Sequence, residues 1–299
     1  MIAGSKVLFI INKYSGTGYK PNLEGKIIDC CAKAEMECTI EFTKNKGHGT
    51  LLARAGVDKG FDAIFAVGGD GTVNEVARGM IDAAVPMGIV PKGSGNGLAL
   101  HLQIPVNIQQ SLELLKASRV VAIDTFTING HLSVSISGIG FDGYIANRFG
   151  KNGKRGLVGY GKLIVQNFGR YDEFVYEANL AGTHISGKSF ILAIANSSQF
   201  GNNARIAQSA SVCDHLLDVC VIRKMPVLNA LDFSRKMFKG NLEKSRFIEI
   251  YRHAELTIET GMPIDYHVDG EPFGVDSRFD VKLNPASLKV IVPSRCYPL

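Results

Sequence analysis

The sequence predicts two successive folded parts: an α/β domain with a parallel, doubly wound sheet, and a mostly antiparallel β domain after it. Two observations lead to this prediction. Strand-like and helix-like stretches alternate with short connections through the first third of the chain, a pattern typical of parallel sheets. From Val120 onward, strand-like segments dominate instead. The length of 299 residues is enough for two domains of ordinary size.

In the α/β part, each expected strand is a short apolar or alternating run that precedes a helical pattern. The clearest helix follows a buried strand and repeats apolar side chains at Val73, Val76, Ala77 and Met80. We place this domain at residues 1–122. Its expected strands cover residues 6–11, 38–43, 62–67 and 87–90, and its main expected helices lie near 21–34, 47–57, 72–80 and 107–117.

The β part begins with an apolar run that ends at Asn129 and Gly130, a pair favoured in tight hairpins. Further strand-like segments follow, and two helical stretches near 157–168 and 226–239 interrupt them. We place this domain at residues 123–285 and expect it to form an antiparallel β-sandwich. The closing segment, 286–299, contains a strand-like run that could return to the first domain.

The composition, with 45% hydrophobic and 20% charged residues, fits a folded globular protein. The net charge of +5 favours anionic partners such as phosphates or acidic lipid surfaces, and without a basic tail it does not indicate nucleic acid. The six cysteines form no CxxC pair, so we expect reduced thiols and a cytoplasmic location. No stretch approaches the roughly 20 apolar residues of a membrane span, so lipid contact is expected to be peripheral.

The strongest local signal is GGDGT, in which Gly68, Gly69 and Gly71 surround Asp70 between a buried strand and a helix. Residues without a Cβ let backbone N–H groups approach phosphate oxygens, and the helix that starts near Thr72 adds its positive end. A carboxylate would repel phosphate, so Asp70 suits a role in holding Mg²⁺ or in orienting the loop. The alternative is an ordinary strand–helix turn with an N-cap at Asp70 or Thr72.

Two further glycine-rich loops follow strands in the same domain: NKYSGTG (12–18) and PKGSGNGLAL (91–100). In doubly wound sheets, ligands bind at the carboxyl ends of the strands. Three such loops at three strand ends are more than turns alone require. They predict a nucleotide or polyphosphate site.

GGDGTVNE followed by PKGSGN resembles the catalytic domain shared by diacylglycerol kinases, sphingosine kinases and bacterial lipid kinases. NKYSGTG is similar to this family's NPxSGxG, with Lys13 in place of proline, and TKNKGHG (43–49) has Gly49 where alanine is usual. SGIGFDGYIA (137–146) and VDGEPF (268–273) resemble two later family segments. NAD kinases share GGDGT, whereas the GSGN loop and the late DGE point to the lipid-kinase branch.

The resemblance implies a Rossmann-like N-terminal domain of the NAD kinase and diacylglycerol kinase type, a C-terminal β-sandwich, and an active site in the cleft between them. ATP and Mg²⁺ are the implied cofactors. Ser94 and Asn96 suit phosphate donors, and Glu75 suits compensation of the dipole of its own helix. The implied nucleotide contacts are Asn12, Ser15, Gly16, Thr43, Gly68, Gly69, Asp70, Gly71, Thr72, Val73, Asn74, Gly93, Ser94, Gly95 and Asn96.

Phosphoryl transfer to an alcohol needs positioning, charge neutralisation and a carboxylate that accepts the hydroxyl proton. Asp269 and Glu271 stand at alternate positions and could face one side of the site. Asp-Gly is also a favoured two-residue hairpin turn, which is the alternative interpretation. The resemblance favours catalysis, with Asp269 as the base, Glu271 orienting it or contacting metal, and Asp70 organising Mg²⁺. Which of Asp269 and Glu271 takes the proton stays open.

ASVCDHLLDVCV (210–221) resembles a segment in which bacterial lipid kinases hold a structural Mg²⁺. The matching ligands are the Asp214 carboxylate and the carbonyls of Ser211 and Leu216. His215 stands where glycine is usual. Because histidine restricts the backbone there, retention of the metal stays open.

These observations predict an ATP-dependent lipid kinase that phosphorylates a hydroxyl of diacylglycerol, a sphingoid base or a related lipid at a membrane surface. Two alternatives remain: a kinase for a soluble acceptor, of the NAD kinase type, and a nucleotide-binding module without catalysis. The pattern does not identify the acceptor, because acceptor selection depends on pocket shape. An oligomer is possible.

Overall fold

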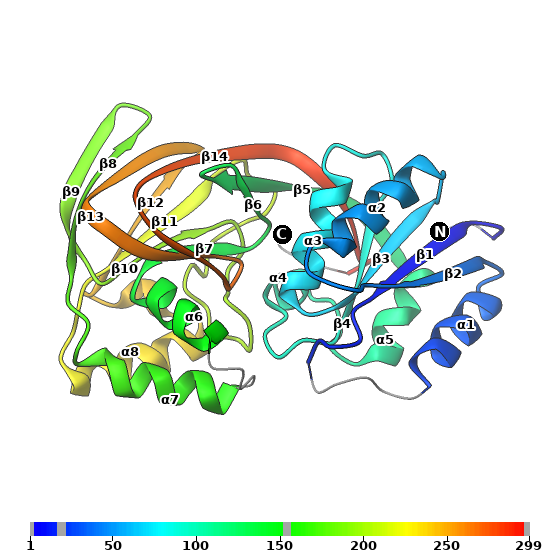
Figure 1. Cartoon of the computed structure of the whole chain (residues 1–299), viewed down its shortest axis with the longest axis horizontal. Coiled ribbons are helices and arrows are strands. Elements are labelled where there is room, and N and C mark those ends of the chain that lie inside the picture. Colours follow the sequence, from blue (N-terminus) through cyan, green and yellow to red (C-terminus); the bar gives the residue numbers. More distant parts are fainter. Residues whose placement is uncertain (1–2, 17–21, 152–156, 296–299) are drawn as a thin grey trace. The chain divides into compact units, whose positions relative to one another are not determined.

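The computed structural model describes residues 3–16, 22–151 and 157–295 and divides into two compact units (Figure 1). Unit 1 comprises Met1–Asp124 with Pro285–Leu299, and unit 2 comprises Thr125–Asn284. The strands β5 (Ser118–Ile128) and β14 (Glu271–Pro293) each contribute to both. The predicted class, an α/β domain followed by an antiparallel β domain, is confirmed.

Unit 1 is built on a parallel sheet in the order β14–β4–β3–β1–β2, in which Val290 of β14 pairs with Met87 of β4. The central strand β3 is buried along its whole length, because helices cover both faces of the sheet. Phe9 of β1 stacks on Phe65 of β3 with ring centroids 4.9 Å apart. The other strands of this sheet are β1 (Lys6–Ile11), β2 (Glu37–Phe42), β3 (Ala63–Gly68) and β4 (Met87–Pro91).

The helices of unit 1 pack as two layers: α2 contacts α3 and β1, and α1 contacts α5 and β2. The predicted apolar stripe of α3 is buried, as its spacing requires. A Cβ on Gly79 would lie 2.5 Å from the carbonyl oxygen of Thr50, so this glycine allows α3 to approach α2 closely. The helices are α1 (Leu23–Lys33), α2 (His48–Asp58), α3 (Asp70–Met80), α4 (Gly97–His101), α5 (Ile108–Leu112) and the 3₁₀ turn η1 (Glu113–Leu115).

Unit 2 is built on antiparallel strands in the order β12–β11–β10–β7–β13–β14, with β8 and β9 as a hairpin beside β13. Alternate residues of these strands face two different cores: Leu192 and Ile194 face one, and Ala193 and Ala195 face the other. The strands are β6 (His131–Ser133), β7 (Ile136–Gly140), β8 (Phe174–Leu180), β9 (Thr183–Ser189), β10 (Ile191–Ala195), β11 (Leu217–Ile222), β12 (Ile248–His253) and β13 (Glu255–Val268).

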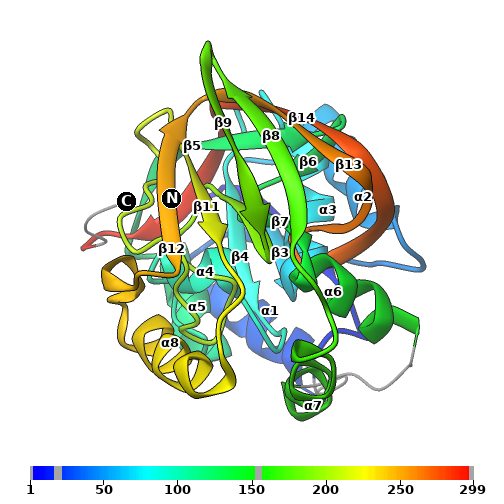
Figure 2. The ribbon, with the colours of Figure 1, turned by 90° about the vertical axis from the view of Figure 1, so that its left-hand side faces the viewer.

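Helices cover one side of this sheet (Figure 2), and α6 is a helix that the sequence interpretation missed. Phe141 and Ile145 of α6 pack with Phe190, and Phe168 of α7 contacts this cluster and the core beneath α8. Glycines in its motif obscured the helical period of α6. The helices are α6 (Phe141–Lys151), α7 (Leu157–Phe168), α8 (Val227–Lys239) and the 3₁₀ turn η2 (Leu242–Lys244).

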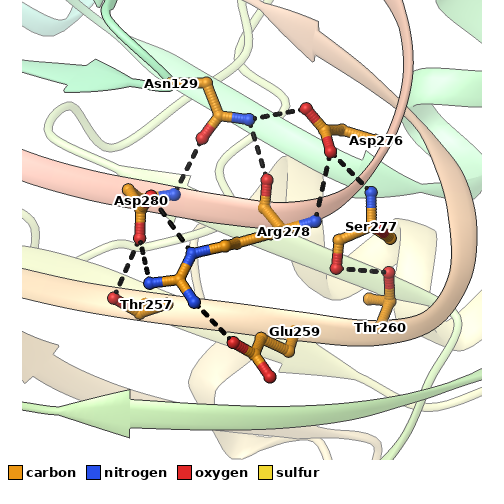
Figure 3. Close-up of polar contacts among 8 residues, drawn as sticks. All are labelled: Asn129, Thr257, Glu259, Thr260, Asp276, Ser277, Arg278 and Asp280. Carbon is orange, nitrogen blue, oxygen red and sulfur yellow. Dashed lines mark hydrogen bonds and ion pairs between the residues drawn. The ribbon is translucent and has the colours of Figure 1, made fainter.

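The predicted Asn129-Gly130 turn joins β5 to β6, and both residues have positive φ, as a type I′ turn requires. The Asn129 amide donates to the Asp276 carboxylate and to the Arg278 carbonyl, and it accepts from the Asp280 N–H. The turn is therefore fixed to β14 (Figure 3). The Arg278 guanidinium bridges Glu259 and Asp280 at the solvent surface, where ion pairs contribute little to stability.

Candidate functional site

Four loops of unit 1 follow the carboxyl ends of four neighbouring parallel strands. Asn12 follows β1, Thr43 follows β2, Gly69 follows β3 and Lys92 follows β4. Parallel strands bring these ends to the same edge of the sheet. The structure thus brings together the segments of unit 1 that are predicted to contact the nucleotide. Thr17 and Gly18 of the NKYSGTG motif lie outside the described residues.

The GGDGT loop and the PKGSGN loop touch through their main chains. A Cβ on Gly93 would lie 2.5 Å from the Cα of Gly69, and a Cβ on Gly68 would clash with the Thr72 side chain. These glycines are therefore required by close contact within the protein itself. Helix α3 begins at Asp70, two residues earlier than expected, so its N-terminal N–H groups belong to this loop.

Asp70 fixes the second glycine-rich loop. Its carboxylate accepts hydrogen bonds from the backbone N–H of Asn96 at 2.9 Å and of Gly97 at 2.7 Å, at the start of α4. These contacts support the loop-orienting alternative. A role for Asp70 in organising Mg²⁺ remains a prediction.

The Asn96 side chain shapes its own loop. Its Oδ1 accepts from the Gly93 N–H and its Nδ2 donates to the Gly93 carbonyl, both at 2.9 Å. Asn96 also has a φ of 57°, a left-handed conformation that asparagine tolerates. The amide is thus engaged within the protein, whereas Ser94 is exposed at the loop tip.

The loop after β1 is tied to the GGDGT segment. Asn12 donates from Nδ2 to the Thr72 hydroxyl at 3.1 Å, and its Oδ1 accepts from the Tyr14 N–H. The Thr43 N–H donates to the carbonyl of Ile11, which holds the next loop beside it. One side-chain contact and one backbone contact therefore connect the loop after β1 to its neighbours.

Lys92 is a site residue that the sequence interpretation missed. Its side chain is buried, and its ammonium donates to the carbonyls of Ser15 at 2.9 Å, Asn12 at 3.3 Å and Lys13 at 3.4 Å. Gly16 has a φ of 65°, and a Cβ there would clash with the Lys92 carbonyl. A lysine directly after a buried strand, inside a glycine-rich motif, was the available signal. Lys92 thus holds the loop after β1 against the loop after β4.

Glu75 caps a neighbouring helix, a role that local pattern did not reveal. Its carboxylate accepts from the backbone N–H of Gly47 at 2.7 Å and of Gly49 at 3.0 Å, at the start of α2. A Cβ on Gly49 would lie 2.8 Å from Glu75 Oε2, so a larger residue here would require the Glu75 side chain to shift. The carboxylate thus accepts from N-terminal N–H groups of α2, which have no partner within that helix.

We predict that Glu75→Ala lowers the free energy of unfolding by about 1–2 kcal/mol, because two N–H groups lose a charged acceptor. Urea denaturation measures this change. Glu75→Gln keeps one acceptor oxygen and is expected to lose less. Equal losses in the two variants would contradict the capping role.

In unit 2, Asp269 forms both the predicted turn and a buried carboxylate. Asp269 and Gly270 have φ values of 48° and 81°, a type I′ turn between β13 and β14. The carboxylate accepts from the Ser133 hydroxyl at 2.6 Å and from the N–H groups of Val134 at 2.9 Å and Ser135 at 3.0 Å. Glu271 is exposed at the first position of β14, so the two acids differ in environment.

A buried histidine supports this turn. His267 Nδ1 accepts from the Gly270 N–H at 3.1 Å, which leaves Nε2 to donate to Asp142 Oδ2 at 3.3 Å. Both side chains are buried. Asp142 belongs to the quoted GFDG segment, and the sequence interpretation gave it and His267 no role. The Asp142–His267 pair thus holds the Asp-Gly turn in position through the hydrogen bond from the Gly270 N–H to His267.

The predicted metal-binding segment has a compact turn at Asp214. Its Oδ1 accepts from the Leu216 N–H at 3.1 Å, and the Ser211 hydroxyl accepts from the Cys213 N–H. His215 has a φ of 61°, so histidine adopts here the left-handed conformation that glycine favours. The backbone restriction expected from His215 therefore does not prevent this turn.

The donors in this segment suit a hard cation. A carboxylate and backbone carbonyls are the oxygen ligands that Mg²⁺ prefers, although Mg²⁺ would have to retain several water ligands. The nearby Asp218 is paired with Arg252 at 3.0 Å, and burial raises its pKa against the effect of this guanidinium. Among the described residues, no group of three or more His, Cys, Asp or Glu side chains forms a metal site.

Comparison with known proteins gives matches along most of the chain. Residues 6–128 match the diacylglycerol kinase catalytic domain, and residues 135–292 match the YegS C-terminal NAD kinase beta sandwich-like domain. A Pectobacterium atrosepticum protein named "Probable lipid kinase YegS-like" is 29% identical over 79% of each chain. A Yersinia pestis protein of the same name is 28% identical over 86% of this chain and 88% of its own.

Solved structures agree on the fold. A structure from Bacillus anthracis str. Sterne has a TM-score of 0.81 at 24% identity and covers 98% of both chains. A diacylglycerol kinase structure from the same source has a TM-score of 0.78 at 22% identity. No helix in the described ranges combines the length and apolar character needed to cross a bilayer. From its two domain matches, the chain belongs to the lipid kinase family that joins a diacylglycerol kinase catalytic domain to a YegS-type β-sandwich domain, and it is a kinase.

Proposed function

We propose that this protein transfers the γ-phosphoryl group of ATP to a hydroxyl of diacylglycerol, a sphingoid base or a related lipid at a membrane surface. The observation that carries the proposal is the set of linked glycine-rich loops at one edge of the parallel sheet, within a chain of the lipid kinase family. The relatives named as lipid kinases support a lipid acceptor.

In this proposal, the main chain of unit 1 binds the polyphosphate. The loops fit such a group because their backbones approach closely at glycines and the N-terminus of α3 lies among them. The contacts would come from the loops at Asn12–Gly16, Thr43, Gly68–Asn74 and Gly93–Asn96. Asp70 and Lys92 would keep these loops in place, and Mg²⁺ bound with ATP would supply neutralisation of phosphate charge.

Asp269 would accept the proton of the acceptor hydroxyl. Three hydrogen bonds fix its carboxylate, and a general base must be held in one orientation. The Asp142–His267 pair would hold the turn that carries it. Glu271 is the second carboxylate of the motif and remains the alternative base.

Direct assay of acceptors tests this function. The purified protein would be incubated with labelled ATP and Mg²⁺, together with diacylglycerol, sphingosine or NAD in separate reactions. We expect a phosphorylated lipid and no phosphorylated NAD. Product from NAD alone would establish a soluble-acceptor kinase, and ATP binding without any product would establish a non-catalytic module.

We also propose a structural Mg²⁺ held by Asp214 and the carbonyls of Ser211 and Leu216. A ligand that binds only the folded state raises the melting temperature, and the rise grows with the logarithm of ligand concentration above its dissociation constant. We predict that Mg²⁺ raises the melting temperature of the wild type in the absence of nucleotide, and raises that of Asp214→Asn less. An equal rise in both would show that Mg²⁺ binds elsewhere.

A further inference from the structure

Helix α8 carries apolar side chains on two sides. Ala230, Phe233 and Met237 point inward and pack on the core beneath the helix. On the outer side, Leu228 is 82% exposed, and Val227, Leu231 and Phe238 are also exposed. The inward stripe accounts for folding of the helix. The outward stripe does not contribute to this core.

The outward apolar residues follow one side of the helix, with Ser234 and Arg235 between Leu231 and Phe238. Leu228, Leu231 and Phe238 are three and seven residues apart, so they lie on one face of an α-helix. Single exposed apolar side chains are normal in proteins, but a row of large ones on one helix indicates an interaction surface. In Figure 2, α8 is the yellow helix of unit 2.

The segment that carries this stripe is positively charged. Residues 226–246 contain five Lys or Arg side chains and two acidic ones, a net charge of +3 in a chain of net charge +5. Arg235 and Lys239 are exposed beside Phe238. Of the acids, Asp232 is paired with Lys236 at 2.9 Å, and Glu243 accepts hydrogen bonds from Ser209.

We propose that α8 docks unit 2 on an anionic lipid bilayer, with its outer stripe in the interface and its basic side chains at the headgroups. An exposed apolar face flanked by Lys and Arg is the pattern of helices that lie in a membrane surface. This proposal rests on the proposed function, since a kinase that phosphorylates a membrane lipid must reach the bilayer. It names the element that makes contact.

Charge complementarity selects lipid over a second copy of this chain. In a two-fold symmetric dimer the same patch meets itself, so Arg235 and Lys239 would be repeated on both sides of the contact. Like charges brought together in this way oppose association. An anionic bilayer supplies the opposite charge across the whole patch.

The absence of tryptophan from the sequence allows a direct test. Leu228→Trp would place a single reporter on the stripe, and Val175→Trp would place one at another exposed apolar site of unit 2, on β8. Vesicles of phosphatidylcholine, with and without phosphatidylglycerol, would be titrated into each variant. We expect a blue shift of the Leu228→Trp emission only with phosphatidylglycerol, and no shift for Val175→Trp.

Sedimentation with the same vesicles tests the contribution of the stripe and its charges. The double variant Leu228→Ser, Leu231→Ser is expected to lose at least about tenfold in vesicle partitioning, and Arg235→Gln with Lys239→Gln to lose the preference for phosphatidylglycerol. Val175→Ser is the matched control and should bind like the wild type.

The proposal would be overturned if the wild type did not bind anionic vesicles. It would also be overturned if the Leu228→Ser, Leu231→Ser variant bound them as strongly as the wild type. Concentration-dependent dimerisation that this variant abolishes would also overturn it, in favour of a second copy. Vesicle binding needs no ATP. A protein that binds vesicles through α8 but phosphorylates no lipid would therefore refute the proposed function and leave the docking surface standing.

Discussion

Replacement of Asp269 by asparagine is expected to lower kcat by about 10²–10⁴-fold, the usual contribution of a general base. Asparagine has nearly the same shape but cannot accept the acceptor's proton. The affinity for ATP should be almost unchanged, because the glycine-rich loops belong to unit 1 and Asp269 to unit 2. Initial rates with saturating lipid, together with calorimetric titration of a non-hydrolysable ATP analogue, measure the two effects separately.

A structural role for Asp269 must be separated from a catalytic one. The asparagine amide would direct an N–H₂ group at one of the present donors, so we expect a stability loss of about 1–3 kcal/mol as well. Ser133→Ala removes the hydroxyl donor to the same carboxylate and keeps the carboxylate itself. If Ser133→Ala, which keeps the carboxylate, matches Asp269→Asn in both lost stability and lost kcat, the effect of Asp269→Asn follows from the fold rather than from a missing base.

Glu271→Gln assigns the proton acceptor. With Asp269 as the base, the loss of kcat in Glu271→Gln should be much smaller than in Asp269→Asn. The reverse order would transfer the role to Glu271, whose exposed position makes its substitution harmless to the fold.

Replacement of Gly93 by alanine is expected to weaken ATP binding about 10- to 100-fold. The new Cβ would lie 2.5 Å from the Cα of Gly69 and 2.9 Å from Asn96 Oδ1, so the two loops would have to separate. Displaced backbone N–H groups would lose their hydrogen bonds to phosphate, each worth about 1.5–3 kcal/mol with a charged partner. Calorimetric titration of the ATP analogue gives the dissociation constant.

Gly25→Ala is the matched control for this substitution. Gly25 lies in α1, with no atom within 4 Å of the position of its missing Cβ and no positive φ. Alanine there should leave ATP binding unchanged and raise stability by up to about 1 kcal/mol, since glycine disfavours helices. If Gly93→Ala bound ATP as tightly as Gly25→Ala, the contact between the loops would have no part in nucleotide binding.

The sequence predicted the fold where local period and turn chemistry decide it. The run predicted at 62–67 lies within one residue of the fully buried strand β3 (Ala63–Gly68), and the stripe from Val73 to Met80 became the inner face of α3, because burial imposes these spacings directly. Asn129-Gly130 formed its turn because few residue pairs accept two positive φ values. Helix α6 was missed, since glycines in its motif weakened the helical signal.

The polar partners within the site were beyond prediction from the sequence. Glu75 contacts Gly47 across 28 positions, and Lys92 contacts Ser15 across 77. Such partners depend on which strands lie side by side, which local pattern does not encode. The Asp269-Gly270 pair shows which part of a site can be predicted and which cannot. The turn was foreseeable from its residues, whereas the three donors around the Asp269 carboxylate come from a segment about 135 positions earlier.

The buried ammonium of Lys92 has a consequence for the time course of nucleotide capture. Lys92 and Asp70 already hold the loops after β1 and β4 in place. The backbone of these loops therefore loses little conformational entropy when ATP binds. Association should then proceed as a single encounter step, without the slow isomerisation that follows capture by a disordered loop. Turnover would be governed by events after nucleotide entry.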